Sequence, residues 1–206
     1  MNSDEIKIKH IKNDLKFLRQ RSEEVDFSKD DIKSYIDLLD KATKKFNLYA
    51  ISPVQIGLPK RIIFFRNTNE DMDKNFDDNY SVGQVMINPV IKEQIGETLF
   101  LEGCGSCHPF WCYVKRPYKV IVEYFNEFGE KKEEVIEGFK ATVFSHEYDH
   151  LDGILHMDVG SDILIMESNE AKEERKIHLY QVISESGKYE RVVNIQNNFE
   201  FDFESK

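Results

Sequence analysis

The sequence has 206 residues, which is enough for one domain with a substantial apolar core. Apolar side chains make up 40% of it, and the net charge is −10. So acidic a chain is repelled by nucleic acid, and we expect no direct nucleic-acid site. No apolar run approaches the roughly 20 residues that span a bilayer, and no signal or transit pattern opens the chain. We therefore expect no membrane segment and a place in the cytoplasm or inside an organelle.

The first half of the chain predicts one helix followed by strands. Residues 1–20 have a poor period and predict a tail or a short strand. Apolar residues recur at helical spacing from Lys29 to Phe46 and predict a helix there. Strands are expected at residues 61–65 and 85–91, and a polar surface loop at 67–80. Pro89 indicates that the second of these strands lies at a sheet edge or contains a bulge.

The second half predicts strands that lead into another helix. Alternating apolar residues predict a strand at 118–125, a turn and a second strand through Ile136. Residues 139–151 predict a helix, residues 163–173 are partly helical, and 192–203 favour a final strand. Because no internal repeat or linker interrupts this pattern, it predicts a single α+β domain over residues 1–206.

The segment from His146 to His150 reads His-Glu-Tyr-Asp-His and places two histidines four residues apart on the predicted helix. Both imidazoles can then bind one metal ion, with Glu147 close to the water on that ion. The alternative is a helix whose histidines are merely solvated or hydrogen-bonded. Asp149 and Asp152 either support the ligands by hydrogen bonds or lie at the surface.

A catalytic site of this kind needs a third protein ligand, and Cys104 is the best candidate. Its glycine neighbours let an ion approach the backbone closely. Two alternatives to this ligand role stay open. Cys104 and Cys107 form a C-x-x-C pair, which is typical of redox or structural zinc sites. Cys104 can also be an inert buried thiol, since free cysteines are often buried. The three clustered cysteines do not resemble a disulfide framework and favour a reducing compartment. We expect His156 to be a polar strand residue and His108 an exposed loop residue.

The residues from Glu102 to Ser106 resemble the E-G-C-L-S motif of peptide deformylases, and His146 to His150 resemble their H-E-x-D-H motif. Other similar segments follow in the family's order: Gln55-Ile56-Gly57, Met86-Ile87-Asn88-Pro89, Arg116-Pro117 and Leu151-Asp152-Gly153-Ile154-Leu155. The resemblance covers about residues 15–158 and leaves 158–206 as a variable C-terminal extension. It implies mixed or antiparallel sheets packed around a central H-E-x-x-H helix.

The resemblance also implies a reaction, the removal of the N-formyl group from the N-terminal methionine of newly made proteins, with release of formate. It implies one divalent metal ion, Fe²⁺ as the native ion with Zn²⁺, Ni²⁺ or Co²⁺ as alternatives, on Cys104, His146 and His150. Glu147 moves the proton of the attacking water. The side chain of Gln55 and the backbone N–H of Gly105 stabilise the oxyanion. The implied partners are nascent N-formyl-methionyl peptides near the ribosome.

The first family motif, G-x-G-L-A-A-P-Q, aligns with residues 48–55, and here the chain departs from it. Gln55 is kept, but Leu48 and Ala50 replace the glycines, and the proline comes one place earlier. A glycine that is required at positive φ cannot be replaced without strain or a changed backbone path. Because this loop contacts substrate in the family, Tyr49 and Ala50 are expected substrate contacts in an altered cleft.

The family forms its methionine pocket partly from residues one and two turns before the first histidine. Those residues are Phe139, Thr142 and Val143 here, so the pocket is expected to be narrower and more polar. The resemblance also suggests an ion pair between Glu102 and Arg116 beneath the cysteine loop. An exposed pair of this kind contributes about 0–1 kcal/mol to stability.

Three functions fit these residues. The first is a metal-dependent peptide deformylase. The second is a deformylase-like hydrolase with an altered cleft that acts on another acyl or peptide substrate, and the third is a poorly active homologue that binds metal or peptide. The altered first motif favours the second and third functions. Retention of Glu147 disfavours the third, because a protein without turnover has no need of a general base.

Overall fold

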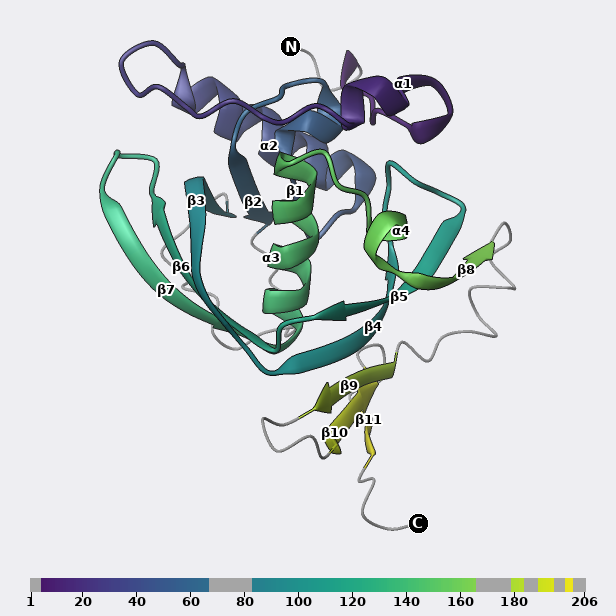
Figure 1. Cartoon of the computed structure of the whole chain (residues 1–206). Coiled ribbons are helices and arrows are strands. Elements are labelled where there is room, and N and C mark those ends of the chain that lie inside the picture. Colours follow the sequence, from purple (N-terminus) through teal and green to yellow (C-terminus); the bar gives the residue numbers. More distant parts are fainter. Residues whose placement is uncertain (1–4, 67–82, 166–178, 184–188, 195–198, 202–206) are drawn as a thin grey trace.

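The computed structural model describes residues 5–66, 83–165, 179–183, 189–194 and 199–201. Two antiparallel sheets lie around a central helix, α3 (Gly138–Leu151), and two further helices cover one end (Figure 1). This arrangement confirms the predicted α+β class with the H-E-x-x-H helix at its centre. Among the described residues, no helix has the length and apolar character that crossing a bilayer requires.

The first sheet has the strand order β1-β2-β3-β6-β7. Its strands are β1 (Ala50–Ile51), β2 (Ile62–Arg66), β3 (Gly83–Ile95), β6 (Lys119–Phe125) and β7 (Lys131–Glu137). The inner strand β2 is apolar on both faces because helices cover both. Ile63 and Phe65 pack in the cluster with α3, while Ile62 and Phe64 pack in the cluster with α2 (Ile32–Phe46).

The second sheet has the order β11-β10-β9-β4-β5-β8. Its strands are β4 (Glu97–Gly103), β5 (Phe110–Arg116), β8 (Ser161–Ile165), β9 (Leu179–Ile183), β10 (Tyr189–Asn194) and β11 (Phe199–Phe201). β3 continues into β4 through Gly96, whose φ of +66° suits a glycine. This tight turn links the two sheets and directs the end of β4 toward α3 (Figure 1).

The remaining elements frame the ends of α3. They are α1 (Ile11–Leu18), the short 3₁₀ helix η2 (Pro53–Ile56) and α4 (His156–Val159). The Arg61 guanidinium holds the end of α3 by donating to the Leu151 carbonyl at 3.3 Å and to the Asp152 carboxylate at 2.7 Å. Gly153 follows with φ of +72°, and a Cβ at that position would overlap the backbone of Arg19.

Most predicted elements are present, and two predictions about them were wrong. Residues 11–18 form a helix rather than a tail or strand, and Ile163 lies in strand β8 rather than in a partly helical segment. The prediction that Pro89 marks either an edge strand or a bulge is confirmed by a bulge, seen as a register shift between Ile87 and Val90 of the inner strand β3. The predicted loop at 67–80 lies outside the described residues, as do parts of the segments predicted at 163–173 and 192–203.

Candidate metal centre and cavity

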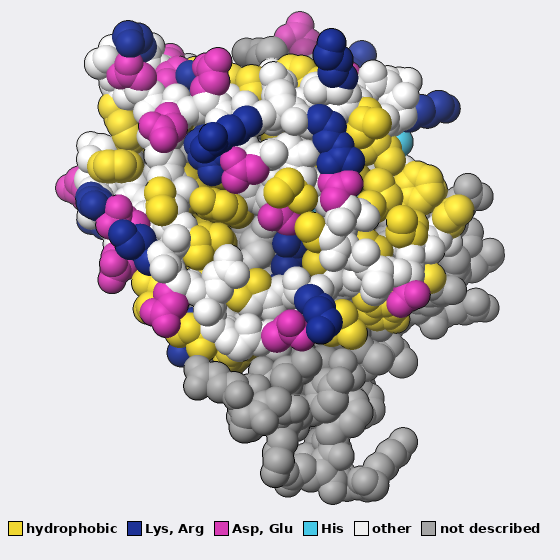
Figure 2. Space-filling view, in the orientation of Figure 1, with side chains coloured by type: hydrophobic (Ala, Val, Ile, Leu, Met, Phe, Trp, Pro, Cys, Tyr) yellow, Lys and Arg dark blue, Asp and Glu magenta, His cyan; other side chains and the backbone are white. Residues whose placement is uncertain are grey.

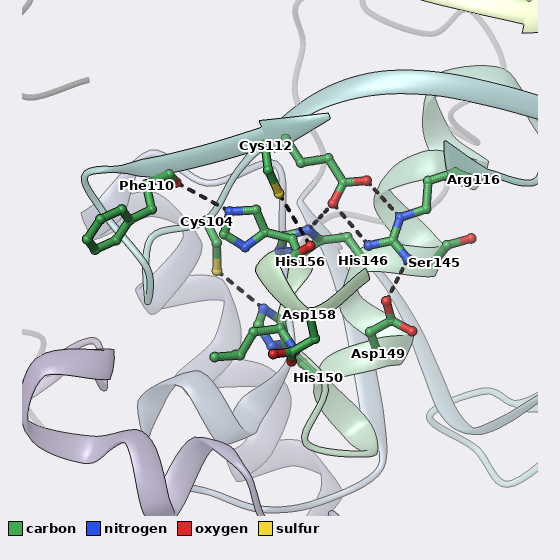
Figure 3. Close-up of polar contacts among 12 residues, drawn as sticks. Cys104, Phe110, Cys112, Arg116, Ser145, His146, Asp149, His150, His156 and Asp158 are labelled. Carbon is green, nitrogen blue, oxygen red and sulfur yellow. Dashed lines mark hydrogen bonds and ion pairs between the residues drawn. The ribbon is translucent and has the colours of Figure 1, made fainter. Parts of the chain in front are cut away.

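Helix α3 presents His146 and His150 on one face, as the spacing predicts. Their ring centroids are 4.9 Å apart, and the rings are nearly perpendicular. Cys104 follows the last residue of β4, and its Sγ lies 3.3 Å from Nε2 of His150. One ligand atom from each of these three residues lies within 4.8 Å of the other two (Figure 3). The structure thus brings together the three side chains that the sequence nominated as metal ligands.

The chemistry of these donors fits a divalent transition-metal ion. One thiolate and two imidazoles suit Zn²⁺, Fe²⁺ and similar ions, and three protein ligands leave a coordination position open. His146 uses its Nδ1 in a 2.8 Å hydrogen bond to Glu102, which leaves its Nε2 for an ion. Nδ1 of the fully buried His150 has no partner within the described part of the chain.

A buried ion-pair network holds this histidine in place. Arg116 donates from Nε to Oε1 of Glu102 at 2.7 Å, from Nη2 to Oε2 of Glu102 at 3.0 Å, and from Nη1 to Asp149 at 2.5 Å. Glu102 and Arg116 are only 3% and 6% exposed, so the pair is present as expected but is not an exposed one. Removing one partner of such a buried pair costs about 3–5 kcal/mol, not 0–1 kcal/mol.

The charge on Glu102 depends on these partners. Burial alone would raise the pKa of this carboxyl, but hydrogen bonds from His146 and Arg116 lower its pKa to about 2. The carboxylate therefore stays ionised and accepts the Nδ1–H of His146. Among the other carboxylates considered, Asp149 joins this network, whereas Asp152 pairs with Arg61 instead.

The Cys104 thiol is set up to ionise. A hydrogen bond from Cys107 is the largest cause that lowers the pKa of Cys104, and the nearby His150 adds to it, although burial opposes both. The hydrogen bond to Cys104 is the largest cause that raises the pKa of Cys107, and burial of the Cys107 thiol adds to it. Cys107 therefore keeps its proton, while Cys104 ionises to the thiolate. The thiolate is the form of cysteine that binds metal.

Glu147 lies beside the histidines and lines a cavity next to them. It is 5% exposed, its Oε2 has no hydrogen-bond partner among the residues that the structure describes, and burial raises its pKa. A carboxylate that is desolvated in this way is a stronger proton acceptor. Ser52 fixes the backbone here, because its hydroxyl donates to the Glu147 carbonyl at 2.7 Å.

Gln55 reaches the same cavity from η2. Its Oε1 accepts from the Ser52 N–H at 3.0 Å, and its Nε2 lies 3.5 Å from the Cys104 sulfur. The amide donor therefore points to the candidate metal centre. Gly105 also lines the cavity, and a Cβ there would make only ordinary contact with Leu48, at 3.8 Å.

The cavity has a volume of about 310 Å³. All five residues nominated as substrate contacts line it, namely Tyr49, Ala50, Phe139, Thr142 and Val143. Four aromatic or aliphatic residues that the sequence analysis did not nominate line it too, namely Leu48, Phe100, Leu101 and Trp111. Trp111 pairs with Gly103 across β4 and β5, and a Cβ at Gly103 would lie 2.6 Å from the indole. The sequence itself shows only that Trp111 is the single tryptophan, and its pairing with Gly103 is known from the structure.

The loop at 48–55 follows a path that needs no glycine at the two replaced positions. The residue with positive φ in this region is Asn47, with φ of +51°, and it caps α2. Leu48 and Ala50 have negative φ, so the replacement causes no backbone strain there. Neither replaced position therefore requires a glycine in this structure.

His156 was wrongly expected to be a strand residue. It begins α4, is 1% exposed, and its ring lies 5.7 Å from that of His146. Burial and the nearby His146 lower the pKa of His156, so this imidazole is neutral. His108 is exposed, as expected. No sequence pattern marks His156, because five residues and the end of α3 separate it from His150.

The polypeptide deformylase family model matches residues 7–174. Peptide deformylase 2 of Clostridium acetobutylicum is 37% identical over 148 residues, which cover 71% of this chain and 91% of the relative. The peptide deformylase of Fusobacterium nucleatum is 35% identical over 155 residues, covering 74% and 82%.

Solved structures give the same result. A probable peptide deformylase from Synechococcus phage S-SSM7 superposes with a TM-score of 0.65 at 33% identity, covering 75% of this chain and 99% of that one. The peptide deformylase of Thermotoga maritima gives a TM-score of 0.64 at 28% identity, covering 76% and 98%.

Proposed function

The chain belongs to the polypeptide deformylase family, and we propose that Cys104, His146 and His150 hold its metal ion while Glu147 moves the protons of the reaction. The chain is a metal-dependent hydrolase, and it removes the N-formyl group from the N-terminal methionine of new proteins. The observation that carries the residue assignment is the grouping of three ligand atoms within 4.8 Å beside a cavity lined by Glu147.

A divalent ion held by Cys104, His146 and His150 would supply Lewis-acid chemistry, which lowers the pKa of a water molecule and polarises a carbonyl. Glu147 accepts a proton from that water and passes it to the departing amine, for which burial and its raised pKa suit it. The Gln55 amide donates to the oxygen on which negative charge develops, and Ser52 fixes the amide's orientation. The N–H of Gly105, next to Cys104 in the same cavity lining, is the second donor.

Substrate is held by the apolar part of the cavity. Tyr49, Phe139 and Phe100 form a continuous aromatic surface, with ring centroids 5.5 and 5.6 Å apart. Such a surface suits the flexible thioether of methionine, since sulfur contacts aromatic rings favourably. Thr142 and Val143 extend the lining along α3, and Ala50 offers the backbone of β1 to the peptide.

The native ion in this proposal is Fe²⁺, and Zn²⁺, Ni²⁺ and Co²⁺ are accepted by the same donors, because a thiolate and two imidazoles do not discriminate strongly among them. The partners are nascent N-formyl-methionyl peptides close to the ribosome. The place of action is then the compartment where such chains are made, the bacterial cytoplasm or the interior of an organelle.

The test is formate release from a short N-formyl-Met peptide. Protein is purified anaerobically, loaded with Fe²⁺ or Ni²⁺ to about one ion per chain, and compared with Glu147→Ala prepared in the same way. Release well above that blank supports the residue assignment. No release from metal-loaded protein would overturn the residue assignment. The substrate would then carry another acyl group, one that the altered 48–55 loop admits.

A further inference from the structure

A second group of metal-ligating side chains lies beside the first and shares the Cys104 sulfur with it. The Sγ atoms of Cys104 and Cys107 and a ring nitrogen of His156 lie within 4.8 Å of one another. All three residues are buried, with exposures of 9%, 0% and 1%. The turn in which the Cys107 N–H donates to the Cys104 carbonyl at 3.0 Å brings the two thiols together.

The orientation of His156 is the observation that points to a ligand. Its Nε2 lies 3.3 Å from the carbonyl oxygen of Phe110, and its Nδ1 has no partner among the described residues. A neutral imidazole donates from one nitrogen and keeps a lone pair on the other. Because the N–H is used at the Phe110 carbonyl, the lone pair remains on Nδ1. Figure 3 shows the His156 ring between Phe110 and the Cys104 sulfur.

Metal-binding histidines are held in this way, with the second ring N–H donated to a carbonyl or a carboxylate. The chain uses the same device at the first group, where Glu102 accepts from His146 at 2.8 Å. Without a ligand, the buried lone pair of His156 carries a desolvation cost with nothing to offset it.

Apolar packing explains the burial of Cys107 but not that of His156. Cys107 belongs to a small buried apolar cluster with Leu18 and Leu155, a place that suits any compact apolar side chain. That cluster gives no reason for a buried histidine beside two thiols, with an unpartnered nitrogen. A bound cation accounts for all three side chains at once.

We propose that Cys104, Cys107 and His156 form a second binding site for a thiophilic divalent cation, Zn²⁺. Two thiolates and one imidazole are ligands that zinc prefers, and a thiolate has lone pairs enough to bridge two ions. On binding, the Cys107 thiol loses its proton to solvent and its sulfur takes the cation. Because the Cys104 sulfur then serves both ions, it donates less charge to the first. Excess Zn²⁺ therefore lowers deformylase activity. The proposal rests on the proposed function only in assigning Cys104 to the first ion.

The test counts zinc ions. The full chain is loaded with excess Zn²⁺, freed of loose metal by gel filtration, and analysed by atomic emission. The wild-type chain retains about two ions, and Cys107→Ser and His156→Phe each retain about one. Cys112→Ala is the matched control, because it removes a buried thiol whose Sγ lies 3.3 Å from the His156 carbonyl oxygen but which is outside the group. This control retains both ions.

A wild-type chain that saturates at one ion would overturn the proposal, as would variants that both keep two. Should the variants fail to fold, which near-ultraviolet circular dichroism detects, anomalous diffraction at the zinc edge from wild-type crystals decides. Two peaks adjacent to the Cys104 sulfur support the second site, and a single peak rejects it. The count does not depend on turnover. Activity is measured separately, on chain loaded with about one Fe²⁺ or Ni²⁺ ion. A chain that is inactive in that form but retains two zinc ions would reject the proposed function alone, and an active chain that retains only one zinc ion would reject this inference alone.

Discussion

Two parts of the cavity lining are built by different interactions. Around His146, charged hydrogen bonds fix each side chain, since Glu102 and Arg116 are buried and joined by bonds of 2.7 and 3.0 Å. Around Phe139, the lining is held by aromatic contacts with Tyr49 and Phe100. Directional bonds tolerate few substitutions, whereas apolar packing accepts many residues of similar volume.

The difference explains how the chain departs from its family. The residues with charge or metal-ligating atoms match the family motifs, while the first motif, which lines the apolar part, is rewritten from Leu48 to Val54. Ala50 has an extended backbone that pairs with Phe65 of β2. This side of the cavity is therefore formed without the two glycines of the family motif. Figure 2 shows acidic and basic side chains interspersed with apolar ones on the outer face, where neither constraint applies.

The largest effect is expected from Cys104→Ala. Loss of the one thiolate among the three ligands should abolish tight metal binding and, with it, all turnover. Metal content after gel filtration checks this, with Cys112→Ala as a control for loss of a buried thiol. Unchanged metal content in Cys104→Ala would mean that another residue is the third ligand.

Glu147→Ala should keep its metal and lose turnover. The ligands stay while the general base goes, so kcat should fall about 10²–10⁴-fold. Steady-state formate release is measured on samples of equal metal content. If this variant retained wild-type kcat, Glu147 would have no part in the proton transfers.

Arg116→Met tests the charged part of the lining. It leaves the buried Glu102 carboxylate without its cationic partner and with only the hydrogen bond from His146. The free energy of unfolding should therefore fall by about 3–5 kcal/mol, and metal affinity should fall about 10–100-fold. Urea unfolding and competitive metal titration measure these.

The matched control is Lys115→Met, which breaks the neighbouring exposed pair with Glu97, at 2.9 Å. Its effect should stay within about 1 kcal/mol. Equal losses in the two variants would contradict the distinction between buried and exposed pairs.

The smallest effect is expected from Phe139→Leu, in the aromatic part. A wider pocket should raise kcat/KM for N-formyl-Phe relative to N-formyl-Met peptides by about tenfold, with metal content unchanged. Phe128→Leu makes the same change at a residue that is 78% exposed and should leave the ratio as it is. A ratio unaltered by Phe139→Leu would place the methionine pocket elsewhere in the cavity.

The sequence predicted the parts of this site that depend on local spacing. His146, Glu147 and His150 share a helix, so a period of four residues places them. Cys104 and Gln55 were predicted from short sequence motifs. Their positions depend on near neighbours in the same motifs, Gly103 and Ser52. All of these lie where they were expected.

Residues that only the tertiary structure brings together were missed. His156 and Trp111 reach the site through α4 and β5, and neither has a periodic neighbour that marks it. Helix α1 was missed for another reason, because in eight residues it buries only Leu18 and bends at Asp14. So short a helix is held by its surroundings rather than by its own sequence.

X-ray absorption at the metal edge tests the central claim most directly. A chain loaded with about one Ni²⁺ or Fe²⁺ ion is measured frozen, without substrate. The account predicts one sulfur ligand and two imidazole ligands, from Cys104, His146 and His150. A spectrum with no sulfur, or with two sulfurs and one imidazole, would contradict it, since the first catalytic ion would then lie outside this group.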